Sequence, residues 1–174
     1  MGGALSGEQI RELCEGPEPL LSGYRDLDAQ VQPNGVDLTV ETVSAFAGGG
    51  RIGRTNANRA LPDLIPQVTD DGGWFTLGPG AYLVTFNEAV WLPLDVMALG
   101  RPRSSIARCG AAIHSAVWDA GYHGRSSSLL VVQNPAGFDL EPDSRILQLV
   151  FFRLDRTTGQ GYAGSYQGER LGSG

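Results

Sequence analysis

The sequence predicts a mainly β protein, a β-sandwich or jelly-roll-like barrel, with one short helix at its N-terminus. Three observations predict this class. Apolar residues alternate with polar ones from about residue 36 onward, several short apolar runs follow, and turn-forming segments such as "LGPG" and "QNPAG" separate them. A chain of 174 residues suits a single domain, here residues 1–174.

The first predicted element is a helix within residues 5–15. Ser6 can cap its first turn while Gln9 reaches back, and Leu5 can pack against Ile10. The pair Gly16-Pro17 then ends the helix, because neither residue continues it.

Strands are predicted after residue 35. The alternation in Val36–Glu41 is typical of a half-buried strand. The run Ile146–Phe152 is almost entirely apolar, which predicts a strand covered on both faces, in part by a neighbouring subunit. The full set of further strands is Ala81–Phe86, Ile113–Trp118, Ser128–Gln133 and Arg145–Arg153.

Two segments lack a clear period. Ala47–Pro66 is rich in Gly, Asn and Arg and is predicted to form an exposed loop or irregular hairpin with solvated arginines. The glycine-rich tail, residues 159–174, carries Tyr162, Tyr166 and Gln167, which give it side chains that can dock on the domain.

Composition excludes several classes. The net charge of −6 disfavours a nucleic-acid binder. No uncharged apolar run reaches the about 18 residues that a membrane span needs. The first residues lack the features of a secretion signal, so we expect a cytoplasmic protein. Cys14 and Cys109 are expected to be buried and unpaired.

All 13 basic residues are arginine, which restricts the possible chemistry. Without lysine there is no Walker A loop and no Schiff base. Residues 1–95 hold 5 Arg against 13 acids, while residues 96–174 hold 8 Arg against 6, so an anion is better tolerated by the second segment. Phosphate binding would have to use Arg, hydroxyls and backbone amides.

The segment "GRPRSSIARCG", residues 100–110, offers those groups. Two arginines flank adjacent serines at a turn between two strands, as a polyphosphate site would require. The alternative is a solvated basic turn.

The segment "VWDAGYHG" places Asp119 at a strand end beside Tyr122. Asp119 is either a turn cap or an acid that orients a water, with Tyr122 offering a flat face to a sugar or base. Other site types are excluded: the chain has no zinc-deaminase signature and no G-x-S-x-G elbow, and its two His and two Cys residues are scattered.

Five segments resemble the dUTPase and dCTP deaminase superfamily, in its order and approximate spacing, and are most similar to archaeal-type dUTP nucleotidohydrolases. They are "VQPNGVDLTV", "RPRSSIARCG", "AVWDAGYHGRSSSLLVVQNP", "RILQLVFF" and "GYAGSYQG". The resemblance covers roughly residues 30–168. It implies a distorted β-sandwich that forms a homotrimer with active sites at the subunit interfaces, and a tail that closes over the nucleotide.

The resemblance also implies roles for particular residues. Asp119 would activate the attacking water, Asp37 would lie near a substrate-bound Mg²⁺ through water, and Tyr122 would pack on the deoxyribose and exclude a 2′-hydroxyl. The phosphate-binding set would be Arg103, Ser104, Ser105, Arg108 and Gln148, and the tail residues closing the site would be Tyr166 and Gln167.

The resemblance leaves two reactions open, hydrolysis of dUTP to dUMP and pyrophosphate or deamination of dCTP. The deaminases need a glutamate on the strand after the hairpin, and "RSSSLLVVQ" between Gly124 and Asn134 contains no acid. The sequence therefore predicts a Mg²⁺-dependent dUTP diphosphatase. A dCTP deaminase, a bifunctional enzyme and a non-catalytic trimeric nucleotide-binding regulator remain alternatives.

Overall fold

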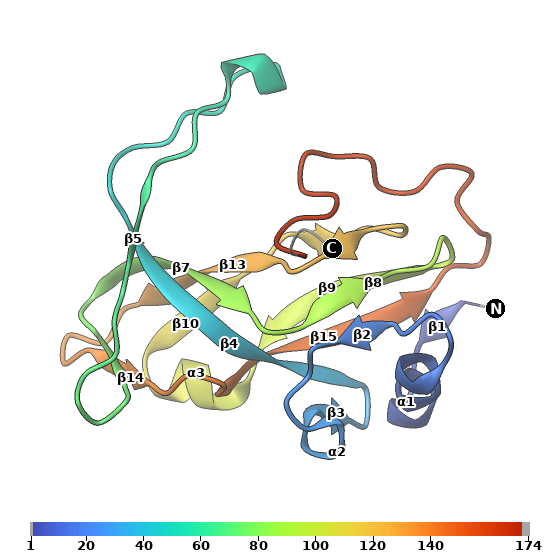
Figure 1. Ribbon diagram of the computed structural model, residues 1–174, viewed down its shortest axis with the longest axis horizontal. Coiled ribbons are helices and arrows are strands. Elements are labelled where there is room, and N and C mark those ends of the chain that lie inside the picture. The colour runs from blue at the N-terminus through green and yellow to red at the C-terminus, as the bar shows by residue number, and fades with distance from the viewer. Residues whose placement is uncertain (1, 172–174) are drawn as a thin grey trace.

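Residues 2–171 are described by a computed structural model, which is mainly β as predicted (Figure 1). The main sheet runs in the order β10-β13-β7-β4-β15-β9-β11, and β1, β3 and β5 pair with its members at the edges. Its strands are β1 (Gly3–Ala4), β3 (Val31–Gln32), β4 (Gly35–Phe46), β5 (Leu64–Pro66), β7 (Gly80–Phe86), β9 (Val96–Pro102), β10 (Ala111–His114), β11 (Val117–Trp118), β13 (Ser127–Val132) and β15 (Arg145–Arg153).

Smaller elements complete the fold. One small sheet has the order β12-β8-β2 and another pairs β14 with β6. Their strands are β2 (Leu21–Ser22), β6 (Phe75–Leu77), β8 (Ala89–Trp91), β12 (His123–Gly124) and β14 (Phe138–Leu140). The helices are α1 (Gly7–Glu15), α2 (Leu27–Gln30) and α3 (Ser104–Arg108), with one 3₁₀ turn at Asn56–Asn58. No helix within residues 2–171 is long and apolar enough to cross a membrane.

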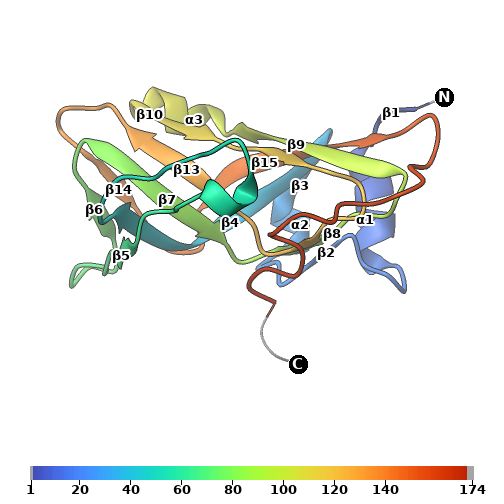
Figure 2. The same ribbon diagram turned by 90° about the horizontal axis from the view of Figure 1, so that it is seen from above.

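Strand β4 changes partner halfway along its length. Residues 36–39 pair with β15, and residues 40–45 pair with β7, with a shift of register between Val40 and Thr42. The main sheet is therefore two curled halves that share β4 (Figure 2). The prediction that Val36–Glu41 is half-buried is wrong, because all residues from Gly35 to Val40 are buried between these halves and the elements that cover them.

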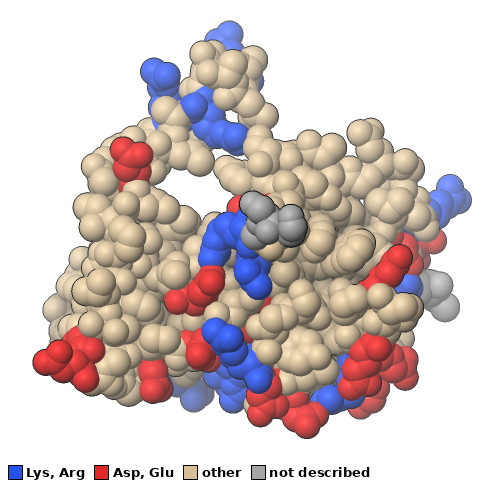
Figure 3. All heavy atoms as spheres, viewed as in Figure 1, with Lys and Arg blue, Asp and Glu red and all other residues tan. Residues whose placement is uncertain are grey.

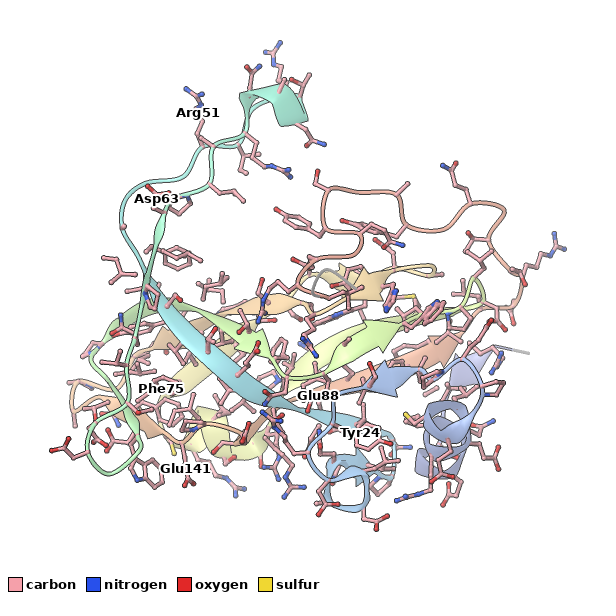
Figure 4. The ribbon with its side chains drawn as sticks, in the orientation of Figure 1. Tyr24, Arg51, Asp63, Phe75, Glu88 and Glu141 are labelled. Atoms are coloured by element: carbon pink, nitrogen blue, oxygen red, sulfur yellow. The ribbon has the colours of Figure 1, made fainter. Side chains whose placement is uncertain are left out.

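A buried glutamate satisfies the backbone where β4 changes partner. Glu88, which is labelled in Figure 4, is fully buried. Its carboxylate accepts hydrogen bonds from the Thr39 amide at 2.9 Å, the Thr39 hydroxyl at 2.6 Å and the Gln30 amide group at 2.7 Å. The neighbouring Asn87 donates to the Thr39 hydroxyl, to the Val40 carbonyl and to the Asp143 carboxylate. A buried amide without a partner is costly, so this network stabilises the break in the ladder.

One predicted strand is divided in the structure, and another keeps its predicted bounds. The predicted strand Ile113–Trp118 is divided into β10, which pairs with β13, and β11, which pairs with β9. The chain leaves one half of the sheet and joins the other between them, and Ser115 there donates to the Gly100 carbonyl at 3.4 Å. Strand β15 has the predicted bounds, but only its inner face is fully buried, and Val150 and Phe152 on the other face are half-buried.

The N-terminal helix is confirmed, with the predicted capping box formed by Ser6 and Gln9. Leu5 and Ile10 are both buried. Cys14 is buried and unpaired as expected, whereas the expectation that Cys109 is buried is wrong. Cys109 caps the C-terminus of α3 on an exposed turn, so no core surrounds it.

Residues 47–63 form an arm that rises away from the body of the domain (Figures 1 and 3). Its base is the pairing of β5 with the end of β4, and one bridge between Arg51 and Ala60 joins its two sides. The predicted irregular hairpin is thus confirmed. Arg59 is not simply solvated, because its guanidinium donates to the Ser165 hydroxyl at 3.0 Å and lies over the Tyr166 ring.

After β15 the tail turns back over the domain (Figure 1), and hydrogen bonds join it to the turn between β11 and β12. Gln167 accepts from the His123 amide at 3.1 Å and donates to the Gly121 carbonyl at 2.9 Å, and the Gly168 amide donates to the His123 carbonyl at 2.7 Å. The tail of the isolated chain is thus held against its own domain. Residues 172–174 of the predicted tail lie outside the described residues.

The contact between the tail and β12 depends on a residue without a side chain. A Cβ atom at Gly124 would lie 2.6 Å from the Tyr122 hydroxyl oxygen and 3.2 Å from Cγ of Glu169. Because the Tyr122 ring is buried, Gly124→Ala should displace the tail rather than the ring. We expect trypsin to cleave after Arg170 about tenfold faster, the effect of losing roughly one hydrogen bond from the closed state.

The matched control is Gly159→Ala, since no atom lies within 4 Å of a Cβ at that tail position. It should be cleaved at the wild-type rate. Equal cleavage rates for Gly124→Ala and wild type would contradict the packing described here.

Glu88 also predicts a dependence of stability on pH. Burial raises the pKa of its carboxyl above the ordinary value of 4.5, although the bonds from Thr39 and Gln30 act in the opposite direction. The folded state therefore binds this proton more tightly than the unfolded state, and above about pH 4.5 the unfolding free energy should fall as pH rises, by at most about 1.4 kcal/mol per pH unit.

Urea unfolding of wild type and Glu88→Gln at a series of pH values tests this. Glutamine cannot titrate, and its NH₂ group would face the Thr39 amide donor, so the variant should be less stable at low pH by about 1–3 kcal/mol. The difference in unfolding free energy between wild type and Glu88→Gln should become smaller as pH rises. Parallel pH profiles for the two proteins would show that Glu88 does not titrate in this way.

Candidate active site

Asp119 opens onto a cavity of about 440 Å³, which we call the Asp119 pocket. Strand β11 ends at Trp118, and the next residues form a turn in which the Tyr122 amide donates to the Asp119 carbonyl at 3.1 Å. Gly121 occupies the left-handed region with φ of +84°, which favours glycine. The pocket is lined by Ala116, Val117, Trp118, Asp119, Tyr122, Ser126, Ser127, Tyr162, Tyr166 and Glu169.

The tail supplies part of this lining. The Tyr122 hydroxyl donates to Glu169 Oε1 at 2.9 Å, and the Tyr122 ring meets Tyr162 edge to face, with centroids 5.6 Å apart. Burial and the adjacent Glu169 charge raise the pKa of Tyr122, so it stays protonated. Burial also raises the pKa of the Glu169 carboxyl, while the Tyr122 bond and Arg170 lower it.

The predicted phosphate segment lies at a second, smaller cavity of about 230 Å³, the Arg103 pocket. Residues 104–108 were expected to form a turn, but they form the short helix α3, with Arg103 at its N-cap. Arg103 and Ser105 line this cavity together with Arg145, whereas Ser104 and Arg108 are exposed on α3.

A buried carboxylate orients the arginine of this pocket. Asp37 is 1% exposed, and its Oδ2 lies 3.0 Å from Arg103 Nε and 3.6 Å from Arg145 Nη1. Burial raises the pKa of Asp37, and the two arginines act in the opposite direction. In the structure Asp37 is the counter-charge of Arg103. Its predicted place near a metal ion, through water, stays a prediction.

The two pockets share no lining residue within one chain. Trp118 pairs with Ala98 on β9, and Arg103 follows five residues later, which is about 16 Å along an extended chain. Gln148, predicted to reach phosphate, pairs with Arg101 and with Asp37, at the Arg103 end of β9. The predicted site residues are thus brought into two groups rather than one.

The two predicted tail residues differ in their placement. Tyr166 lines the Asp119 pocket, whereas both ends of the Gln167 side chain bond the backbone of the β11–β12 turn.

Sequence reasoning missed Glu169 and Arg145, and it named Tyr162 only as a tail residue that can dock on the domain. Glu169 is the single acid of the segment 159–174, and that isolation was the available signal. The contact between Arg145 and Asp37 joins residues that are far apart in the sequence, and no feature of the sequence indicated it. Within the described residues, no group of three or more His, Cys, Asp or Glu side chains could hold a metal ion.

Comparisons with known proteins agree with this arrangement. A family model described as dCTP deaminase-like matches residues 4–154. Curated proteins named "Probable deoxyuridine 5′-triphosphate nucleotidohydrolase" match nearly end to end: the one from Methanosarcina mazei is 45% identical over 95% of this chain and 96% of its own length, and the one from Archaeoglobus fulgidus is 46% identical over 97% and 98%.

A solved structure supports the fold. The crystal structure of 2′-deoxycytidine 5′-triphosphate deaminase from Agrobacterium tumefaciens superimposes with a TM-score of 0.68 at 24% identity, over 87% of this chain and 49% of that one. With the family model covering most of the chain and relatives above 40% identity, the protein belongs to the dCTP deaminase-like family, together with these archaeal nucleotidohydrolases.

Proposed function

We propose that the protein is a dUTP diphosphatase that hydrolyses dUTP to dUMP and pyrophosphate. The observation that carries the proposal is the identity of 45% over 95% of the chain to a protein named for this activity. The Asp119 pocket supports it, because it combines an exposed carboxylate on a fixed turn with an aromatic wall suited to a sugar.

The Asp119 carboxylate would accept a proton from a bound water as the water oxygen attacks the α-phosphorus. The bond to the oxygen that bridges to the β-phosphate then breaks, and pyrophosphate leaves. Arg103 and Ser105 would stabilise the negative charge of the phosphates, since fixed donors dominate catalysis of this kind. The buried Asp37 would keep the Arg103 guanidinium in place before the substrate arrives.

We also propose that Mg²⁺ enters with the triphosphate. The absence of a metal-binding cluster within residues 2–171 fits an ion that is held chiefly by phosphate oxygens and water. When bound, such an ion would neutralise charge on the leaving pyrophosphate. Asp37 is too buried in this chain to contact that ion directly.

The geometry further supports a homotrimer with sites shared between subunits. The lining of the Asp119 pocket contains no Arg among the described residues, so the cations for the phosphates must come from elsewhere. An apolar row lies at the edge of this pocket, where Leu99 on β9 pairs with Val117 on one side and with Val150 on the other. Val117 is 48% exposed and Leu99 is 39% exposed. In the proposed trimer a second copy covers this apolar row and supplies its own Arg103 pocket to Asp119.

Deamination of dCTP is the second candidate. The family description favours it, and Glu169 places a carboxylate in the Asp119 pocket that sequence reasoning did not foresee. Strand β13, however, carries no acid, in contrast to what the resemblance requires of a deaminase.

Incubation with dUTP, dCTP, dTTP and UTP, each with Mg²⁺ or with EDTA, separates these functions. We expect pyrophosphate from dUTP in the presence of Mg²⁺, a strong loss with EDTA, and no ammonia from dCTP. Ammonia release would instead support the deaminase, and binding of dUTP without any product would support a regulator.

The shared site predicts complementation between inactive variants. Asp119→Asn and Arg103→Ala should each lower turnover by about a hundredfold. Asp119→Asn removes the general base, and Arg103→Ala removes a hydrogen-bond donor to the phosphates. Co-expressed in equal amounts, the two chains should form mixed trimers in which roughly a quarter of the sites carry both intact residues. Recovery of about that share of the wild-type activity is expected, and no recovery would mean that each site lies within one chain.

A further inference from the structure

The Tyr122 hydroxyl is engaged at the Asp119 pocket by a residue of its own chain. It donates to Glu169 Oε1 at 2.9 Å, and both residues line the pocket. The neighbouring Ser126 accepts from Trp118 Nε1 at 3.0 Å. Because a tyrosine hydroxyl carries a single proton, the bond to Glu169 leaves Tyr122 no free donor with which to meet a ligand.

The ring of Tyr122 is fixed as well. Tyr122 is 5% exposed, its ring and that of Tyr162 pack edge to face, and the missing Cβ of Gly124 leaves room for its hydroxyl. Glu169 is held by its backbone, since its carbonyl accepts from the Arg125 amide at 2.9 Å. Tyr122 is therefore held in one position, with its hydroxyl committed to Glu169.

We propose that Glu169 is a positioning residue for sugar specificity, which acts by engaging the Tyr122 hydroxyl so that it cannot donate a hydrogen bond to the sugar of the nucleotide. The inference rests on the proposed function in that it takes a nucleoside triphosphate as the ligand of the Asp119 pocket. A 2′-hydroxyl placed against the Tyr122 ring would lose its water and find no donor on Tyr122, whereas a 2′-deoxy sugar has no such hydroxyl to desolvate.

Without Glu169 the hydroxyl proton of Tyr122 would be free to bond a ligand. It could then pair with a 2′-hydroxyl, and ribonucleotides would be accepted better. This consequence separates positioning from a merely structural role, because loosening the tail alone would lower kcat/KM for dUTP and for UTP by the same factor.

The test measures kcat/KM for dUTP and for UTP in wild type, Glu169→Ala, Glu169→Gln and Tyr122→Phe. The dUTP-to-UTP ratio should fall about tenfold in Glu169→Ala, the worth of one hydrogen bond to a buried hydroxyl. Glu169→Gln should keep the ratio within about threefold, because its amide oxygen can still accept from Tyr122.

The double variant Tyr122→Phe, Glu169→Ala gives the sharpest outcome. Phenylalanine keeps the ring but has no hydroxyl to offer a ribose, so the double variant should regain the wild-type ratio. A low ratio in the double variant, or an unchanged ratio in Glu169→Ala, would overturn the proposal. Glu141→Ala, an exposed glutamate at the far edge of the domain, is the matched control (Figure 4).

Equilibrium binding of the non-hydrolysable α,β-imido analogues of dUTP and UTP provides a second readout. The ratio of their dissociation constants should change in the same variants and by the same factor. A wild-type protein that releases no pyrophosphate would refute the proposed function while this binding ratio still decides the role of Glu169.

Discussion

The fold depends on the place where β4 changes partner, and there on one buried carboxylate. A strand shared by two sheet halves interrupts its own ladder, and the interruption leaves backbone donors and acceptors in a region without water. Glu88 and Asn87 satisfy these groups at Thr39 and Val40, and Gln30 ties the N-terminal segment to the same point. The cost of burying the Glu88 carboxylate is offset by three donors directed at it.

The same strand carries the polar contact that orders the Arg103 pocket. Asp37 lies two residues before Thr39, and its carboxylate faces Arg103 and Arg145, which come from the end of β9 and the start of β15. The position of these arginines therefore depends on the register of three neighbouring strands. The Asp119 pocket has a different origin, because its floor is the β11–β12 turn and its wall is the returning tail. The Asp119 pocket lies beside the start of β9 and the Arg103 pocket lies at its end, so much of the length of this strand separates them.

Much of the fold and part of the site could be predicted from local pattern. The capping box of α1, the bounds of β15 and the irregular arm all follow from residues near one another in sequence. Asp119 and Tyr122 also fall in one pocket, since a turn of a few residues sets both. The division of Ile113–Trp118 into two strands was not predictable, because the segment reads as one short strand-like run and only the partner strands of its two halves differ. The burial of Cys109 was predicted wrongly for a similar reason. The apolar character of a residue does not reveal whether another element of the fold covers that residue.

By itself, the sequence determined the class of fold, the short-range motifs and the types of group available for chemistry, all arginine and no lysine among the cations. These are properties of composition and of neighbours along the chain. Only the tertiary structure decided which distant groups meet: Glu169 with Tyr122, Arg145 with Asp37, and Arg59 with Ser165. Such contacts join residues separated by tens of positions and arise from how strands and tail pack, so no local pattern encodes them.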